Sequence, residues 1–183
     1  RSAAKNLGIS DKVLNNNLKK KLKTNSPIAN EILNLNEKDQ KIRINQMVEQ
    51  LASRLTKNKN DLDGWIKLYK SYKVLNYQDK AINALRIATK ISPKNLNLKQ
   101  ILLKELLPPE KEPIFSAEIE QLVNEILANE PKNISALFFK GLRALKEGKN
   151  EIAIENWTLL LDQIPPGSQM ALELLKKINN IKN

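Results

Sequence analysis

Apolar residues recur at steps of three and four along most of this chain, as expected for helices that bury one face. The first clear case covers residues 37–57, whose inward positions are Ile44, Met47, Val48, Leu51 and Leu55. The same kind of pattern predicts helices over residues 96–107, 116–129 and 168–181. Abundant Leu, Lys, Asn and Ile, with only 5 glycines, favour helices joined by short turns. The sequence therefore predicts an all-α fold.

Within residues 60–95 the apolar positions follow a spacing that is typical of the tetratricopeptide repeat (TPR), a helix–turn–helix unit of about 34 residues. The matching positions are Trp65, Leu68, Tyr72, Ala81, Leu85, Ala88 and Pro93. The spacing returns in residues 133–166, at Leu137, Gly141, Ala144, Ala153, Trp157 and Pro165. Successive TPR units stack side by side, which predicts a right-handed helical solenoid of about three repeats plus flanking helices.

The middle repeat, residues 96–131, carries an insertion, because Trp65 and Leu137 are separated by two repeat lengths and a few extra residues. Pro108, Pro109 and Pro113 predict an extended connection between its two helices. The flanking helices have distinct places. Residues 37–57 stand where the second helix of a preceding repeat would be, and residues 168–181 are expected to cap the last repeat.

Residues 1–36 form a poorly patterned basic extension, set apart from a TPR domain at residues 37–183. Residues 1–30 contain seven Lys or Arg against one acid. A short helix is expected there, carrying Val13, Leu14, Leu18 and Leu22. The basic cluster of Lys19, Lys20, Lys21 and Lys23 suits anionic lipid headgroups if a membrane anchor lies close by, or else a frayed tail.

Composition excludes several classes of function. The chain has no cysteine and no histidine, so thiol chemistry, Cys or His metal sites and histidine base catalysis are absent. We expect no enzymatic activity, no cofactor and no metal. The net charge of +11 suggests nucleic acid or an anionic membrane as a partner. Beyond residue 30, however, basic and acidic residues are interspersed, which favours an ordinary solvated surface and no nucleic-acid binding.

Several stretches are similar to one family in particular. Residues 47–55 read MVEQLASRL, residues 61–65 read DLDGW, and residues 71–75 read SYKVL. With the IENW segment at residues 154–157 and the PPGS ending at residues 165–168, they resemble the periplasmic TPR domain of the CcmI/CycH family of cytochrome c maturation proteins. The resemblance covers roughly residues 40–181. Three features depart from the family pattern: Lys59 replaces a proline, Asn76 replaces a turn glycine, and the expected transmembrane pair is absent.

This resemblance implies a membrane-anchored protein whose repeat domain lies on the periplasmic face of the bacterial cytoplasmic membrane, with the anchor upstream of this chain. It implies that the domain holds the C-terminal helix of apocytochrome c and presents it to the haem-ligation machinery. The alternative is a generic TPR scaffold for protein–protein interaction or a co-chaperone.

TPR arrays bind ligands along the concave surface formed by the first helix of each repeat. On this chain the corresponding positions are Ile66, Lys70, Lys73, Leu103, Leu106, Phe138, Leu142 and Leu145. Two roles remain open for Phe138, Leu142 and Leu145, which either receive a ligand or only pack on neighbouring helices. Lys70 and Lys73 either form a basic rim for acidic groups or are simply solvated. Trp65 and Trp157 occupy packing positions, and Asp61 is expected to cap a helix.

Overall fold

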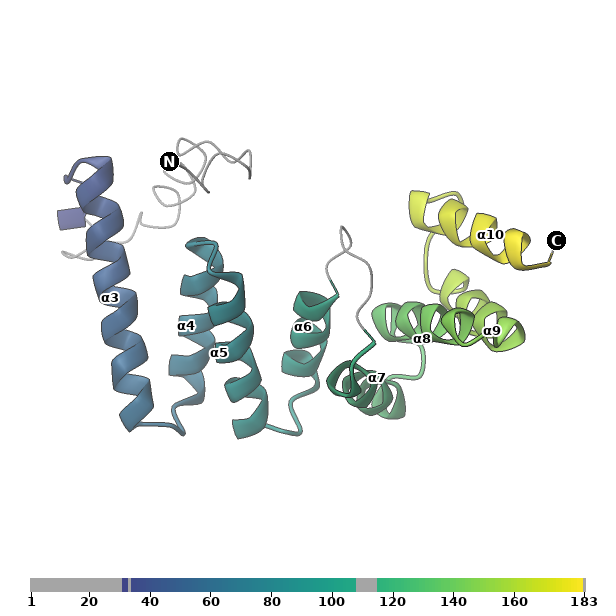
Figure 1. Cartoon of the computed structure of the whole chain (residues 1–183), viewed down its shortest axis with the longest axis horizontal. Helices are drawn as coiled ribbons and strands as arrows, with labels where there is room; N and C mark the ends of the chain where they lie inside the picture. Colours follow the sequence, from purple (N-terminus) through teal and green to yellow (C-terminus); the bar gives the residue numbers. More distant parts are fainter. Residues whose placement is uncertain (1–30, 33, 108–114, 183) are drawn as a thin grey trace. The chain divides into compact units, whose positions relative to one another are not determined.

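The computed structural model describes residues 31–32, 34–107 and 115–182 (Figure 1). These residues contain helices and turns but no strand, which confirms the predicted all-α class. The helices of the described ranges are α3 (Glu37–Lys57), α4 (Leu62–Val74), α5 (Gln78–Ile91), α6 (Leu96–Leu106), α7 (Ala117–Asn129), α8 (Ile134–Lys146), α9 (Asn150–Leu161) and α10 (Gln169–Lys182). The helix expected within residues 1–30 and the proline-rich connection at residues 108–113 lie outside the described residues. No helix in the described ranges is long and apolar enough to cross a membrane.

A repeated capping interaction fixes where several of these helices begin. A side-chain oxygen just before the helix accepts a hydrogen bond from the third backbone N–H of the helix, which satisfies one of its unpaired donors. The capping residues are Asn36, Asp61, Asn95, Ser116 and Asn133. Asn95 and Asn133 both end a Pro-Lys-Asn sequence, so the duplicated turn starts α6 and α8 in the same way.

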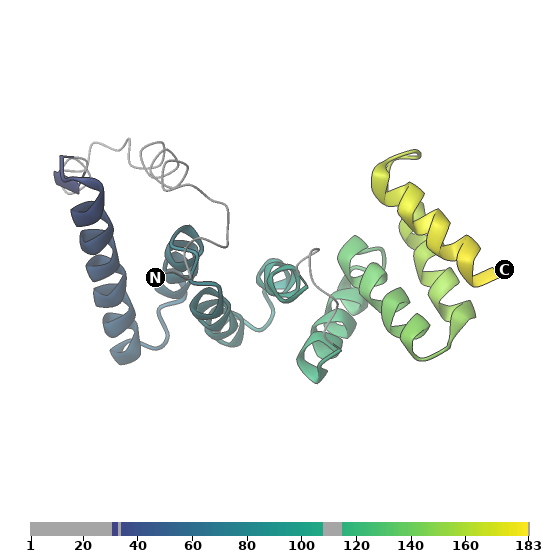
Figure 2. The same cartoon turned by 45° about the horizontal axis from the view of Figure 1, so that its top comes forward.

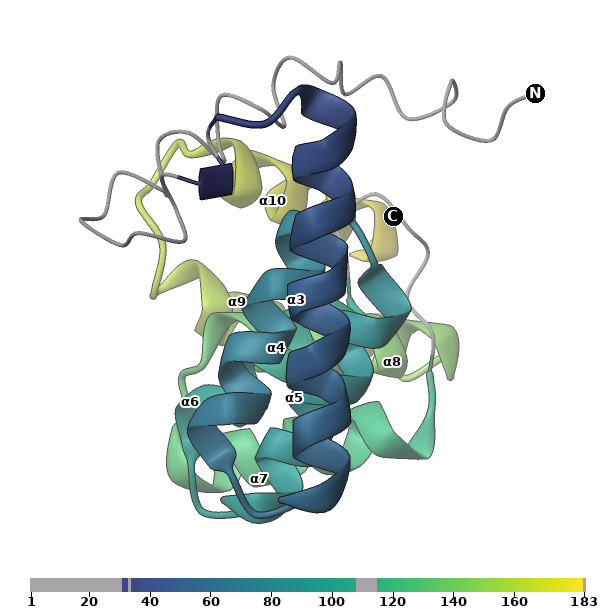
Figure 3. The same cartoon turned by 90° about the vertical axis from the view of Figure 1, so that its left-hand side faces the viewer.

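The chain divides into two compact units, residues 1–84 and 85–183. In the first unit, α3 lies alongside α4 (Figure 3). Asp61 joins them: its carboxylate accepts from Gly64 N at 2.8 Å and pairs with Arg54 on α3 at 3.0 Å. Trp65 is buried and donates through Nε1 to the carbonyl of Lys59 at 3.0 Å. Both expectations, the cap at Asp61 and the core position of Trp65, are confirmed.

Gly64, the glycine of the DLDGW stretch, lies where α4 packs closely against Asp61 and α3. A Cβ at this position would lie 2.5 Å from Asp61 Oδ2 and 2.5 Å from Leu55 Cδ2. A larger residue would have to push aside the Asp61 carboxylate and the Leu55 side chain, so glycine lets the first turn of α4 approach both without displacing them. This stretch is therefore structural, and it serves to hold α3 against α4.

In the second unit, neighbouring helices pack as successive pairs: α6 with α7, α7 with α8, α8 with α9, and α9 with α10. The last three helices, drawn from green to yellow in Figure 2, share one core. Its buried members are Leu137, Trp157, Leu160, Leu174 and Ile178. Trp157 is fully buried, as its repeat position predicts, and its Nε1 donates to the carbonyl of Phe138 at 3.3 Å.

The terminal helix α10 buries only some of its apolar residues. Its larger apolar residues include Met170, Leu174, Leu175 and Ile178, but only Leu174 and Ile178 are buried, together with Ala171. Met170 and Leu175 are 43% and 44% exposed, so they lie outside the core. Positions 171, 174 and 178 share one face of a helix, and Leu175 lies about 100° away from Leu174.

Candidate functional site

Helix α8 carries apolar residues around most of its circumference. Its fully packed side consists of Ala136, Leu137, Phe139, Gly141 and Ala144. A second set, Phe138, Leu142 and Leu145, is only half-buried and packs partly against the core of α8, α9 and α10. The spacing of these three residues, i, i+4 and i+7, places them along one side of the helix. They share in packing and also keep apolar surface that a ligand can reach.

Helix α6 contacts α8 within the same unit. Leu106 on α6 is half-buried, as the α8 residues are. Leu103 is 0% exposed, so it belongs to the core and offers no surface to a ligand. In the second unit, the predicted ligand surface therefore reduces to Leu106, Phe138, Leu142 and Leu145.

The three predicted site residues of the first unit all lie on α4. Ile66 is half-buried, Lys70 is exposed, and Lys73 is half-buried with its Nζ donating to Gln78 Oε1 at 2.9 Å. They form a small apolar and basic surface on their own helix.

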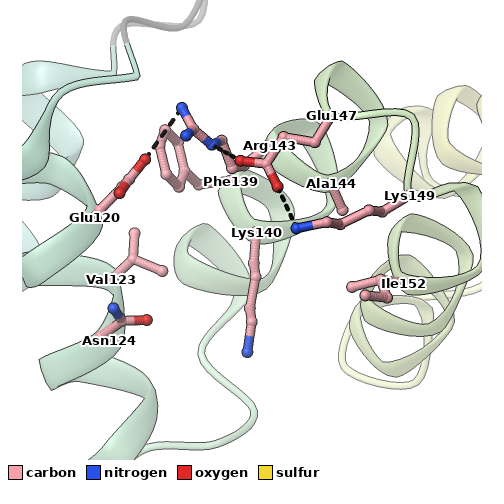
Figure 4. A pocket seen from close by; sticks show the side chains of 10 residues that line it. All are labelled: Glu120, Val123, Asn124, Phe139, Lys140, Arg143, Ala144, Glu147, Lys149 and Ile152. Atoms are coloured by element: carbon pink, nitrogen blue, oxygen red, sulfur yellow. Dashed lines mark hydrogen bonds and ion pairs between the residues drawn. The ribbon is translucent and has the colours of Figure 1, made fainter.

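A cleft of about 280 Å³ lies between α7, α8 and the start of α9 (Figure 4). Its apolar lining is Val123, Phe139, Ala144 and Ile152, and its polar lining is Glu120, Asn124, Lys140, Arg143, Glu147 and Lys149. These residues come from three successive helices and from the turn between α8 and α9, so periodicity within a single helix gives no signal for the cleft.

The charges at one wall of the cleft form a continuous chain of ion pairs (Figure 4). Arg143 NH1 lies 3.1 Å from Glu120 Oε1, and Arg143 Nε lies 2.5 Å from Glu147 Oε1. Lys149 Nζ donates to Glu147 Oε2 at 2.8 Å. The hydrogen bond from Lys149, followed by that from Arg143, lowers the pKa of Glu147 below its ordinary value. Glu147 is thus an ionised carboxylate with two cationic partners, a poor candidate for a general base.

The described residues contain no group of three or more acidic side chains arranged to hold a metal ion. The available surfaces are apolar sides of helices bordered by lysine and by paired charges. Such surfaces are suited to binding another polypeptide.

Comparisons with known proteins agree with this picture. Residues 23–171 match the family model for the cytochrome c-type biogenesis protein H TPR domain. The cytochrome c-type biogenesis protein CycH of Bradyrhizobium diazoefficiens is 40% identical over 50 residues, which are 27% of this chain and 14% of that protein. The CycH protein of Rhizobium meliloti is 39% identical over 59 residues, 32% of this chain and 16% of that protein.

The aligned regions are therefore only a small part of the curated relatives. The family model, in contrast, covers well over half of this chain. We conclude that the chain belongs to the TPR domain family of cytochrome c-type biogenesis proteins.

Proposed function

We propose that this chain is a non-catalytic holder of polypeptide in cytochrome c maturation. It binds the C-terminal amphipathic helix of an unfolded c-type cytochrome and presents that chain to the haem-ligation machinery. The observation that carries the proposal is the half-buried apolar side of α8, formed by Phe138, Leu142 and Leu145 next to a fixed core. Family membership supplies the biological setting.

An amphipathic helix binds by laying apolar side chains at i, i+3, i+4 and i+7 against a prepared apolar surface. The side of α8 has the matching spacing, and Leu106 on the contacting helix α6 adds to it. Because these side chains already pack against the core, little conformational freedom is lost when the ligand binds.

The surface needs no contact with haem to select unfolded cytochrome. The apolar side of the cytochrome's terminal helix is packed away once that protein folds, so only the unfolded chain can present it. In the first unit, Ile66, Lys70 and Lys73 offer an apolar and basic surface of their own, which we propose also contacts the polypeptide. By the family resemblance, we further propose that the domain works on the periplasmic face of the bacterial cytoplasmic membrane.

The test is calorimetry with a synthetic peptide of a cytochrome C-terminal helix, using the parent protein and the Leu142→Glu variant. A charge in place of an apolar contact costs roughly 1–3 kcal/mol. The dissociation constant should therefore rise roughly fivefold to 150-fold. The matched control is Leu159→Glu, which changes an exposed leucine on α9 and should leave the affinity unchanged.

Since Leu142 also packs against the core, both variants are first compared with the parent by urea unfolding, and binding is measured where each is fully folded. Failure of the parent to bind the peptide contradicts the function. Equal affinity for a scrambled peptide of the same composition favours the generic scaffold or co-chaperone. Unchanged affinity in folded Leu142→Glu contradicts the site alone.

A further inference from the structure

Helix α10 exposes more apolar surface than a helix that only caps a repeat array requires. Met170, Leu172 and Leu175 are 43%, 58% and 44% exposed. Single exposed leucines are common on protein surfaces. Here three exposed residues lie on one helix, whose buried side is formed by Ala171, Leu174 and Ile178. At 100° per residue, Met170 and Leu175 border this buried side, and Leu172 lies furthest from it. A capping helix is expected to present a polar outer face.

The repeat length relates the residues of α10 to residues of α8. Counting one repeat length of about 34 residues from Phe138 reaches Leu172, and the same count from Leu142 reaches Lys176. The buried position Leu137 corresponds in the same way to the buried position Ala171, and Ala144 corresponds to Ile178. Helix α10 therefore occupies the place of the first helix of a further repeat. Of its outer residues, Leu172 and Lys176 continue the series that Phe138 and Leu142 begin on α8.

The two surfaces belong to one packed body. Leu174 and Ile178 of α10 join Leu137, Trp157 and Leu160 in a single core. Phe138, Leu142 and Leu145 pack partly against this same core. The outer side of α10 is thus held by the elements that position the apolar side of α8.

Charge distinguishes the α10 surface from that of α8. Leu172, Leu175 and Lys176 stand at i, i+3 and i+4, so they are neighbours on one side of the helix. Lys176 is exposed and makes no ion pair within the described part of the chain. Glu173 is the single acid of α10, and its Oε1 accepts from Gln169 at 3.0 Å. A ligand here meets apolar surface beside an available cation.

We propose that α10 extends the ligand surface of α8 and sets part of its specificity. Leu172 and Leu175 receive apolar side chains of the bound helix, and Lys176 pairs with an aspartate or glutamate on the bordering polar side of that helix. This inference rests on the proposed function. The favoured occupant is accordingly an amphipathic helix of unfolded cytochrome whose apolar side is bordered by a carboxylate.

The experiment uses the full chain and a synthetic cytochrome C-terminal helix peptide that carries a glutamate on its polar side. Leu172→Ser and Lys176→Glu should each raise the dissociation constant at least fivefold in calorimetry. The matched controls should stay within twofold of the parent: Leu159→Ser, an exposed leucine on α9, and Lys177→Glu, the neighbouring lysine about 100° further around α10.

A charge exchange makes the test specific. A peptide in which glutamate is replaced by lysine should bind Lys176→Glu more tightly than it binds the parent, since the ion pair is restored in reverse. If the parent binds the original peptide and both α10 variants bind equally well, the inference fails while the function stands. If the parent does not bind, the proposed function fails, and the inference fails with it.

Discussion

At the scale of single residues, Gly141 on α8 lies directly against Trp157 on α9. A Cβ on Gly141 would overlap Trp157 Nε1. The indole is fully buried and held by the carbonyl of Phe138, so it cannot move aside without disturbing the core. Glycine is therefore required here for close helix packing.

We predict that Gly141→Ala lowers the free energy of unfolding by about 1–3 kcal/mol, the usual cost of overpacking a core. The higher helix propensity of alanine offsets part of that loss. Urea unfolding measures the difference. Ser135→Ala, at an exposed position of the same helix, is the control and should be neutral or slightly stabilising. An equally stable Gly141→Ala protein would mean that α8 and α9 can move apart at no cost.

Residue patterns in the sequence predict the capping role of Asp61 and the buried positions of Trp65 and Trp157 because these roles depend on local spacing. They do not predict that Asp61 also pairs with Arg54, seven residues away across a turn. Lys59 acts through its backbone carbonyl, which accepts from Trp65. Any residue has that carbonyl, so the departure from proline is compatible with the turn.

At the scale of helices, α6 and α7 are joined by an ion pair on their surface. Lys99 Nζ lies 2.6 Å from Glu125 Oε2, and Lys99 is 14% exposed. Gln121 donates to the other carboxylate oxygen at 2.8 Å. Lys99, followed by Gln121, lowers the pKa of Glu125 from its ordinary value of 4.5. A carboxylate with a depressed folded-state pKa stabilises the fold above its unfolded pKa, and that contribution is lost as the pH falls through the folded pKa.

We therefore predict that Glu125→Gln reduces the loss of stability on acidification. The urea midpoint is measured at pH 7 and again about one unit below the ordinary glutamate pKa, and the difference is compared with that of the parent. Glu155→Gln is the control, because Glu155 is exposed on α9 and makes no ion pair among the described residues. If the Glu125→Gln protein loses as much stability on acidification as the parent, Glu125 does not contribute to the acid response.

The sequence predicts closely where helices begin and end. It predicts which face of a helix is buried only where the helix has one dominant apolar stripe. Helix α3 spans Glu37–Lys57, the range that its pattern predicts, and α5 ends at Ile91 just before Ser92-Pro93. Helix α10 has two apolar stripes, one containing Leu174 and one containing Leu175. Periodicity alone cannot show which stripe is buried, because that depends on which stripe packs against α9.

At the scale of the whole molecule, the repeat spacing predicts the helical class from sequence. The cleft beside α8 depends on contacts such as Glu120 with Arg143, between helices of different repeats. Such contacts depend on how the repeats pack, which no spacing within one repeat specifies. The same reason explains Leu103, whose repeat position predicts a ligand contact but whose side chain is fully buried.

The net charge of +11 permits a test of the nucleic-acid alternative. Binding that neutralises 6–10 phosphates weakens about 10³- to 10⁵-fold between 50 and 200 mM salt. Peptide binding through an apolar surface with one ion pair should weaken by less than about tenfold over that range. Calorimetry at both salt concentrations measures how much the peptide affinity changes. A peptide affinity as salt-sensitive as phosphate binding would contradict an apolar site.

The division of the 2 tryptophans between the units has an optical consequence. Trp65 belongs to the first unit, and Trp157 belongs to the core against which Phe138 packs. Because the Trp157 indole donates to the backbone carbonyl of Phe138, a ligand that shifts Phe138 also changes the polarity around that indole. The Trp65→Phe protein, which retains Trp157, should thus report ligand binding at the proposed α8 surface by its own emission, without any attached label. The reciprocal protein, which retains Trp65 alone, reports the first unit.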